Sequence, residues 1–274
     1  MLQCHLMITA QSQSVGHLLR EWRTRRRRSQ LDLALEAKIS SRHLSFLETG
    51  RSRPSREMLL RLAEHLAIPL RDRNILMIAA GYAPVFPERS LDDPALHAAR
   101  KAINQLLIGH EPYPALAIDR HWTLITYNAS LRPLTAGLPA EFFKPPINVL
   151  RASLHPNGLA PRIANLPEWR AHLLARLRHQ IELTADPILN DLLKELEQYP
   201  SGGKSTTSVA EGVYGDVAVP FELITDSGKL SFLSTTMIFG TPIDITLSEI
   251  ALEFFFPADA PTTEALQRLT VRMA

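Results

Sequence analysis

The sequence predicts a five-helix, all-α domain followed by an α+β domain with an antiparallel sheet. Apolar residues recur at helical spacing from residue 15 to 82, and three prolines interrupt that pattern between Tyr82 and Pro94. Short strand-like runs separated by turn residues then fill the end of the chain. We therefore expect an N-terminal extension at 1–13, a helical domain at 14–82, a linker at 83–95, a mixed domain at 96–258, and a tail or short helix at 259–274.

The first domain is predicted to consist of five short helices. In the first of them, Val15, Leu19 and Trp22 fall on one face. A serine hydroxyl can accept a hydrogen bond from a free amide of the first helical turn, and glycine suits a helix end. The later helices are expected at 31–38, 41–49, 56–66 and 70–80, with Ser29 and Ser55 as N-caps and Gly50 and Gly81 at helix ends.

The second domain is predicted to combine helices with two groups of strands. Short strands at 115–119 and 122–127 are joined by a tight turn, and apolar residues between Trp169 and Ile181 recur at helical spacing. An α+β arrangement with the helices on one sheet face accommodates this order. Further helices are expected at 96–108 and 188–196, and three hairpin-connected strands at 221–225, 230–239 and 245–256.

Charge is distributed unevenly between the two domains. Residues 1–82 hold 14 Lys and Arg against 7 Asp and Glu, a net charge of +7, while the remainder holds 16 against 21, a net charge of −5. A basic domain attracts polyanions, whereas an acidic one does not. We therefore expect different partners for the two domains, although a basic solvated helix face is the alternative for the first.

Composition excludes several classes of protein. The chain is 45% hydrophobic and 21% charged, as in ordinary soluble domains, and it has no apolar run of the roughly 18 residues that a membrane span needs. The first ten residues carry no Lys or Arg, so they lack the basic start of a secretory signal. We expect a cytoplasmic protein with no membrane partner.

Chemical motifs do not indicate an enzyme. Cys4 is the single cysteine, so neither an internal disulfide nor a thiolate metal site is expected. His172 and His179 are seven residues apart, too far for one ion, and no GxSxG, P-loop or GxGxxG pattern occurs. We expect no catalytic residue, no metal and no cofactor.

Residues 29–55, SQLDLALEAKISSRHLSFLETGRSRPS, predict a helix-turn-helix. Ala34 is small enough to let two helices cross closely, and the positions of Ile39, Leu44 and Leu47 close a core beneath the second helix. Helical geometry then directs the remaining side chains of that helix outward, where they can reach base edges in the major groove. Gln30 is expected to direct its amide toward a phosphate, and the arginines after the helix to contact the strand. The expected DNA-contacting residues are Gln30, Ser41, Arg42, His43, Ser45, Phe46, Arg51 and Arg53.

This stretch resembles the Xre (lambda-repressor-like) helix-turn-helix regulators. The segments RHLSFLETGRSRPSREMLLRLAEHL and NILMIAAGYAP look like the MmyB-like branch in particular. In the second domain, YPALAIDRHWTLITYN and HPNGLAPRIANLPEWRAHLLARLRHQ are similar to the PAS-like ligand-binding module of that branch. The resemblance implies a bacterial transcription regulator that binds double-stranded DNA, with a sensor domain that takes a fatty acid.

The resemblance also makes local expectations about the helix-turn-helix. It implies a salt bridge between Arg23 and Glu48 that joins the first helix to the recognition helix. Two residues depart from the family pattern: Lys38 replaces a glycine in the turn, and Arg28 replaces an apolar residue under the second helix. A left-handed backbone at Lys38 costs about 1 kcal/mol for a residue other than glycine.

A fatty-acid site in the second domain needs an apolar interior with a polar boundary that binds the carboxylate. Aromatic and aliphatic residues on the sheet and helices supply the interior, and nearby Arg, Asn and Tyr supply the donors; the alternative is that these apolar residues form an ordinary core. The expected ligand residues are Trp122, Tyr127, Asn128, Arg132, Arg151, Phe142, Leu177 and Phe232.

Three functions of the second domain remain open at this point. It senses a small apolar ligand and thereby changes how two chains present their recognition helices, or it is a ligand-free interaction and dimerisation module, or it is an enzyme acting on a lipid or metabolite. One helix-turn-helix domain is too small to bind DNA tightly alone, so we expect a homodimer. The missing nucleophile and metal motifs disfavour the enzyme.

Overall fold

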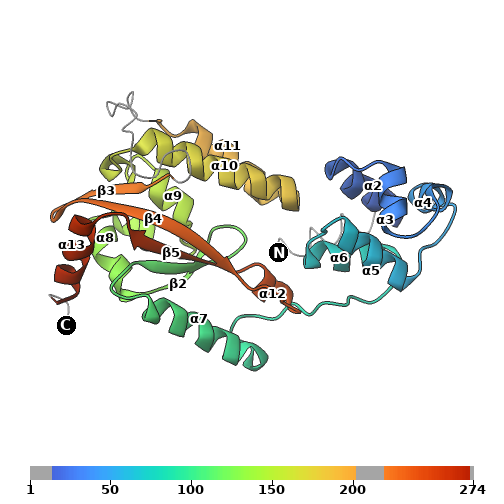
Figure 1. Cartoon of the computed structure of the whole chain (residues 1–274), viewed down its shortest axis with the longest axis horizontal. Helices are drawn as coiled ribbons and strands as arrows, with labels where there is room; N and C mark the ends of the chain where they lie inside the picture. Colours follow the sequence, from blue (N-terminus) through green and yellow to red (C-terminus); the bar gives the residue numbers. More distant parts are fainter. Residues whose placement is uncertain (1–13, 202–218, 272–274) are drawn as a thin grey trace. The chain divides into compact units, whose positions relative to one another are not determined.

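A computed structural model describes residues 14–201 and 219–271 of the chain (Figure 1). The chain forms two compact units, which divide between Arg89 and Ser90, inside the predicted linker; the first unit also includes Glu182–Thr184 and Pro242–Ser248. The predicted N-terminal extension, including Cys4, lies outside the described residues.

The first unit contains the five predicted helices. Their bounds differ from the prediction by at most a few residues, because caps and apolar spacing were both visible in the sequence. They are α2 (Val15–Arg25), α3 (Gln30–Glu36), α4 (Ser41–Glu48), α5 (Arg56–His65) and α6 (Leu70–Ala79).

The ends of these helices are determined by local hydrogen bonds. Serines precede four of the five helices, and each hydroxyl accepts a hydrogen bond from an amide three residues later. Each of the five helices is followed by a residue with a left-handed backbone, which lets the next amide donate to a carbonyl of the last turn. The N-caps are Ser14, Ser29, Ser40 and Ser55, and the left-handed residues are Arg27, Lys38, Gly50, Ala67 and Gly81.

The core of the first unit lies beneath α4. Leu44 and Leu47 are fully buried there, and Ala34 of α3 is 1% exposed, as the close crossing of α3 and α4 requires. Helix α2 also approaches α4 closely, because a Cβ at Gly16 would lie only 2.3 Å from the carbonyl oxygen of Leu47. Gly16 thus fixes the distance between α2 and the end of α4.

The second unit is built around a five-stranded antiparallel sheet of order β2-β1-β5-β4-β3. Most of its helices are inserted between β2 and β3, and this arrangement is that of a PAS-like fold, as the resemblance implied. The strands are β1 (Ala115–Ile118), β2 (Leu124–Tyr127), β3 (Phe221–Thr225), β4 (Gly228–Ile238) and β5 (Ala251–Pro257). The helices are η1 (Pro94–Leu96), α7 (His97–Gly109), η2 (Ala129–Leu131), α8 (Arg132–Thr135), η3 (Ala140–Phe143), α9 (Val149–Leu154), η4 (Ala160–Arg162), α10 (Leu166–Thr184), α11 (Pro187–Gln198) and α13 (Ala260–Val271). A further helix, α12 (Ile245–Ser248), lies between β4 and β5 in the chain and belongs to the first unit.

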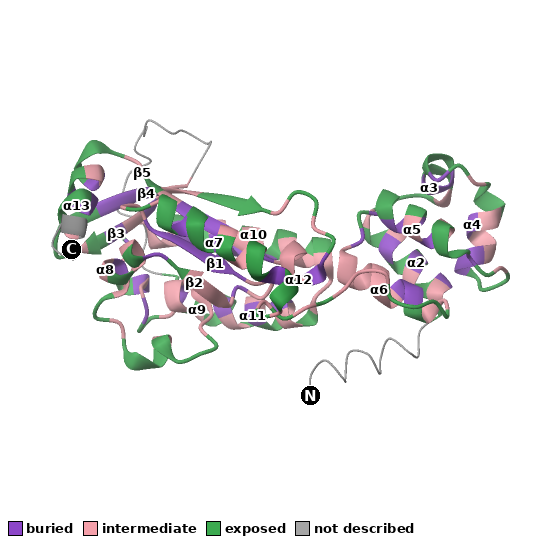
Figure 2. Cartoon of the chain, turned by 90° about the horizontal axis from the view of Figure 1, so that it is seen from below, coloured by how far each residue is buried: buried purple, intermediate pink, exposed green. Residues whose placement is uncertain are grey.

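Helices cover both faces of this sheet, so the expectation of helices on one face only was wrong. Helices α10 and α11 pack on one face, where they bury Leu173, Leu177 and Phe232, and α7 lies on the opposite face (Figures 1 and 2). His110, at the end of α7, packs against Phe254 with ring centroids 5.0 Å apart. Strand β1 agrees with helices on both sheet faces, because all four of its residues are buried, as expected of a strand covered on both sides.

The last predicted strand, 245–256, was wrong in its first half. Ile245–Ser248 forms the short helix α12, and strand β5 begins at Ala251. Asp244 explains the difference, because its carboxylate accepts a hydrogen bond from the amide of Thr246 at 2.9 Å and its carbonyl accepts one from Ser248. The apolar run alone did not reveal this cap.

We expect Gly16→Ala to lower the free energy of unfolding by about 1–3 kcal/mol, since the added methyl group would overlap the carbonyl of Leu47. Gly109→Ala is the control, because a Cβ at this last residue of α7 meets nothing within 4 Å. Chemical denaturation of both variants measures the difference. Equal stability of the two variants would show that α2 and α4 are not closely packed.

Lys38→Gly is expected to raise the free energy of unfolding by up to about 1 kcal/mol, because Lys38 has a φ of 55° in the helix-turn-helix turn. The same replacement at Lys101, an exposed interior position of α7, is expected to destabilise by about 1 kcal/mol. Thermal unfolding of both variants should therefore give shifts of opposite sign. Destabilisation by Lys38→Gly would contradict the left-handed turn.

Candidate functional site

The outer face of α4 carries the residues predicted to contact DNA. Ser41 and Arg42 are exposed at the start of the helix, and Ser45 and Phe46 are half-buried on the next turn, while Leu44 and Leu47 face the core. His43 is also half-buried, and its amide donates to the hydroxyl of Ser40. The structure therefore brings the predicted base-reading residues together on one surface.

Phe46 is flanked by two arginines on this surface. The guanidinium carbon of Arg42 lies 5.4 Å from the ring centroid of Phe46, and that of Arg51 lies 5.9 Å from it. Arg53 is exposed two residues further along the chain. An aromatic ring between guanidinium groups combines an apolar contact for a thymine methyl with donors for a guanine edge or a phosphate.

The carboxylate of Glu48 is buried at the end of α4 and connects three helices. Arg23 of α2 donates to it twice, at 2.6 and 2.9 Å, and Gln30 of α3 donates at 2.8 Å. The expected Arg23–Glu48 salt bridge is thus present, and the hydrogen bond to Glu48 raises the pKa of Arg23. The amide of Gln30, however, is directed to Glu48, so the structure does not show the expected orientation toward a phosphate.

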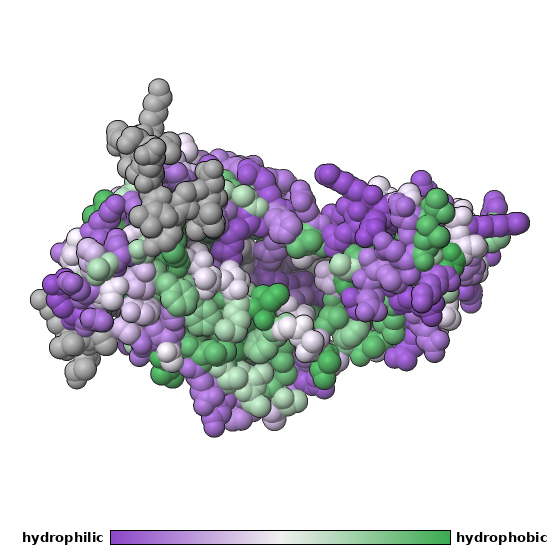
Figure 3. Space-filling view, viewed as in Figure 1, coloured by the Kyte–Doolittle hydropathy of each residue, from purple (hydrophilic) through white to green (hydrophobic). Residues whose placement is uncertain are grey.

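The run of arginines after α2 has structural partners that the sequence did not reveal. Arg26 lies 5.1 Å from the centroid of Trp22 and donates to the carbonyl of Leu66 at the end of α5. Arg28 forms an ion pair with Glu36 at 2.6 Å and is exposed, rather than lying under the second helix. In Figure 3, hydrophilic side chains cover most of the surface over α2.

Four of the predicted ligand residues lie inside the second unit. Trp122, Leu177 and Phe232 are at most 6% exposed in the core between the sheet and α10. Asn128 is 3% exposed, and its side chain bonds to backbone groups of Leu107, Tyr113 and Ala115 instead of capping the following helix. Their role as ligand residues stays a prediction, and Asn128 has a structural role that accounts for its burial.

The other predicted ligand residues are exposed, apart from Phe142, which is half-buried. Tyr127 and Arg132 are exposed, and Phe142 packs edge-on against the turn residue His155 with centroids 5.3 Å apart. Arg151 donates to Glu195 from Nε and Nη2, at 2.7–3.0 Å. The structure therefore does not bring Arg151 to the buried group of Trp122, Leu177 and Phe232.

Glu195 of α11 links Arg151 to Tyr199, the residue that follows this helix. The hydrogen bond from Arg151 lowers the pKa of Glu195, and the hydroxyl of Tyr199 donates to the same carboxylate at 2.5 Å. Burial and this carboxylate together raise the pKa of Tyr199 to about 12. Arg151 and Glu195 thus form a surface ion pair that is hydrogen-bonded to the phenol of Tyr199.

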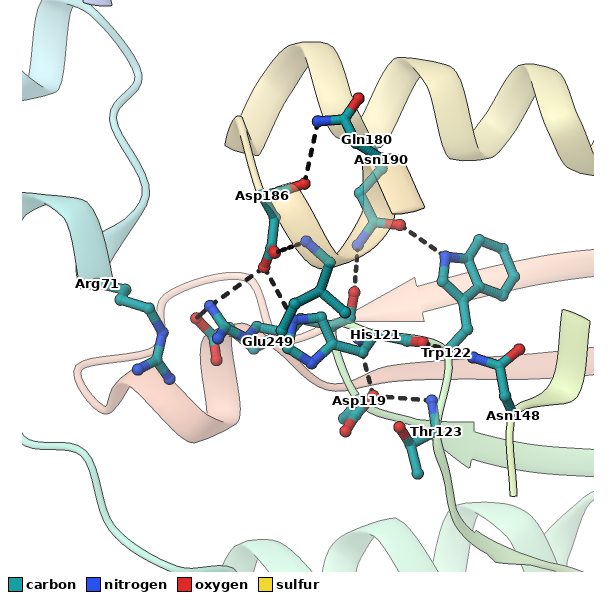
Figure 4. Close-up of polar contacts among 12 residues, drawn as sticks. Arg71, Asp119, His121, Trp122, Thr123, Asn148, Gln180, Asp186, Asn190 and Glu249 are labelled. Carbon is teal, nitrogen blue, oxygen red and sulfur yellow. Dashed lines mark hydrogen bonds and ion pairs between the residues drawn. The ribbon is translucent and has the colours of Figure 1, made fainter. Parts of the chain in front are cut away.

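Trp122 occupies a left-handed backbone conformation in the connection between β1 and β2. Its φ is 64°, which is uncommon and strained for a bulky residue. The turn is stabilised by Asp119, whose carboxylate accepts from the amides of His121 and Thr123, and by Gln180 of α10, which accepts from the indole of Trp122 at 2.7 Å (Figure 4). The sequence predicted the tight turn but not the conformation of Trp122.

His121, in the same turn, contacts Asp186 at the start of α11. The two side chains are 2.9 Å apart, and Arg120 lies 3.6 Å from Asp186 (Figure 4). Burial opposes ionisation of Asp186, but the hydrogen bond from His121 and the nearby positive charges hold its pKa below the usual value. This turn is thus attached to both α10 and α11.

A second buried ion pair was missed by the sequence analysis. Glu253 of β5 is 4% exposed, and Arg176 of α10 donates to its two carboxylate oxygens at 2.6 and 3.2 Å. The signals were an acidic residue inside the apolar run of β5 and an arginine between apolar positions of α10, and neither alone is distinctive.

Two features are absent from the part of the chain that the structure describes. Within 14–201 and 219–271, no group of three His, Cys, Asp or Glu side chains has an arrangement that could hold a metal ion. In the same part of the chain, no helix is both long and apolar enough to cross a bilayer.

Comparison with known families defines the class of protein. The family described as "MmyB-like transcription regulator ligand binding domain" matches residues 99–269, and a helix-turn-helix family matches residues 19–72. The chain is therefore a DNA-binding transcription regulator with a ligand-binding domain. It belongs to the MmyB-like transcription regulators and has an Xre-type helix-turn-helix.

Other comparisons add little. No curated protein matches the chain. A solved structure described as "Structure of an RNA-binding Light-Oxygen-Voltage Receptor" is 11% identical, covers 98% of this chain and 67% of that one, and has a TM-score of 0.24. This likeness is too low to carry an argument.

Proposed function

We propose that this regulator binds a fatty acid or a similar apolar small molecule in its second domain and changes its affinity for operator DNA on doing so. It binds DNA as a homodimer, acts in the cytoplasm and catalyses no reaction. The observation that carries the DNA-binding part is the outer face of α4, where Ser41, Arg42 and Phe46 lie beside Arg51. A dimer presents two such helices to half-sites about one helical turn apart.

The ligand part of the proposal is supported by the interior between the sheet and α10. Leu173, Leu177 and Phe232 form an apolar region there, and the half-buried Arg176 on the same helix supplies charge at its edge. An acyl chain with a carboxylate needs these two features together.

A ligand-free interaction module is the second candidate for this domain. The observation that favours it is the near-complete burial of Trp122, Leu177 and Phe232 against other core residues, which is typical of a filled core. Both candidates are compatible with DNA binding by the first domain.

Denaturing mass spectrometry of the purified full chain distinguishes the two candidates. We expect release of an acyl species of about 14 to 18 carbons, the size that such a domain encloses. Lipid-stripped protein to which palmitate is added back serves as the control. A chain without lipid that also takes up no palmitate would contradict the sensor function and favour the interaction module.

Arg42→Ala is expected to weaken operator binding by about 1–3 kcal/mol and to relax the preference at one base position, because Arg42 lies at the base-reading end of α4. Arg53→Ala is the matched comparison, since a phosphate contact weakens binding to all sequences and lowers the salt dependence. Selection from randomised DNA measures both variants. An unchanged base preference in Arg42→Ala would show that Arg42 does not contact a base.

A further inference from the structure

The ion pair between Arg176 and Glu253 closes a small polar network inside the second unit. Besides the two contacts between their side chains, the hydroxyl of Thr236 lies 2.9 Å from Arg176 Nη2 and 2.9 Å from Glu253 Oε1. The network thus joins α10 to β4 and β5 on the sheet face that α10 covers (Figure 1).

Its surroundings are apolar and aromatic. The guanidinium carbon of Arg176 lies 4.9 Å from the ring centroid of Trp122. Leu173, one turn earlier on α10, and Leu177, the next residue, are at most 4% exposed. Burial of a charge pair in such surroundings costs desolvation free energy, and apolar residues of similar size are often at least as stabilising. The pair is therefore poorly explained by stability alone.

Two unfavourable features meet at this point. Trp122 has the strained φ of 64°, and its indole lies directly against the guanidinium of a buried ion pair. Strained backbone conformations concentrate at functional sites. The coincidence of the two features distinguishes this place from the surface pair of Arg151 and Glu195.

The network also reaches the surface. The side chain of Arg176 is 26% exposed and Thr236 is exposed, whereas the side chain of Glu253 beneath them is 6% exposed. An anion arriving between α10 and β4 would therefore meet the guanidinium first. Its apolar part would face the interior that contains Leu173 and Leu177.

We propose that Arg176 binds the carboxylate of the fatty acid and that Glu253 occupies the same guanidinium when no ligand is bound. This inference rests on the proposed fatty-acid function. Glu253 is then an internal competitor whose carboxylate resembles the ligand headgroup, and on binding it keeps the hydroxyl of Thr236 as its partner. Trp122 lies against the guanidinium of Arg176, so its surroundings change when the ligand carboxylate replaces Glu253.

The test compares palmitate with cetyl alcohol, which has the same chain length and no charge, by isothermal titration calorimetry on the lipid-stripped full chain. A hydrogen-bonded charge corresponds to about 10- to 100-fold in affinity, so the native chain should prefer palmitate by that factor. The double variant Arg176→Met/Glu253→Gln removes both charges together and avoids leaving either one buried alone. It should bind the two lipids equally.

Two single variants complete the design. Glu253→Gln should bind palmitate several-fold more tightly, because the competing charge is removed while hydrogen-bonding atoms remain. Arg178→Met is the control on the same helix, since Arg178 forms an exposed ion pair with Glu197, and it should bind like the native chain.

Each outcome separates the inference from the function on which it rests. If the native chain prefers palmitate and the double variant keeps that preference, the headgroup site lies elsewhere and the inference is overturned. Unchanged palmitate affinity in Glu253→Gln would show that Glu253 does not compete with the ligand carboxylate for Arg176, and would overturn that part of the inference. If the native chain binds neither lipid, the fatty-acid function itself fails, and the inference fails with it.

Discussion

The pairing of a buried carboxylate with an arginine, which occurs in each unit, is the constraint on which the arrangement of both depends. A carboxylate removed from water requires a charged or hydrogen-bonding partner, and each carboxylate here has an arginine on another element as that partner. Glu48 joins α4 to α2 through Arg23, and Glu253 joins β5 to α10 through Arg176. The two pairs fix the elements that carry the DNA-contacting surface and the proposed ligand site.

In the first unit this constraint determines how α4 is presented. Arg23 and Gln30 contact Glu48 from α2 and α3, so the outer face of α4 is rigidly oriented. The close approach of Gly16, on α2, to the carbonyls of Leu47 and Glu48 supports the same geometry at the end of α4. DNA recognition then depends on the few side chains that remain outside, chiefly Arg42 and Phe46.

Local chemistry made much of the fold predictable from the sequence. Serine caps, glycine at helix ends and helical spacing located the first five helices, because these signals act within a few residues. The short helix at Ile245–Ser248 was missed because the residues after its cap, Asp244, also fit the pattern of a strand. The Arg176–Glu253 pair was missed because its residues are 77 positions apart and meet only after the sheet has formed.

The most direct test of the account is DNA affinity with and without lipid. Binding of the full chain to a selected operator should be titrated at fixed salt, first after lipid removal and then with saturating palmitate. The account predicts a change of about 5- to 150-fold in operator affinity, and the reciprocal change in palmitate affinity when operator is added. Identical operator affinity in the two states, with palmitate demonstrably bound, would contradict the account of a ligand-controlled regulator.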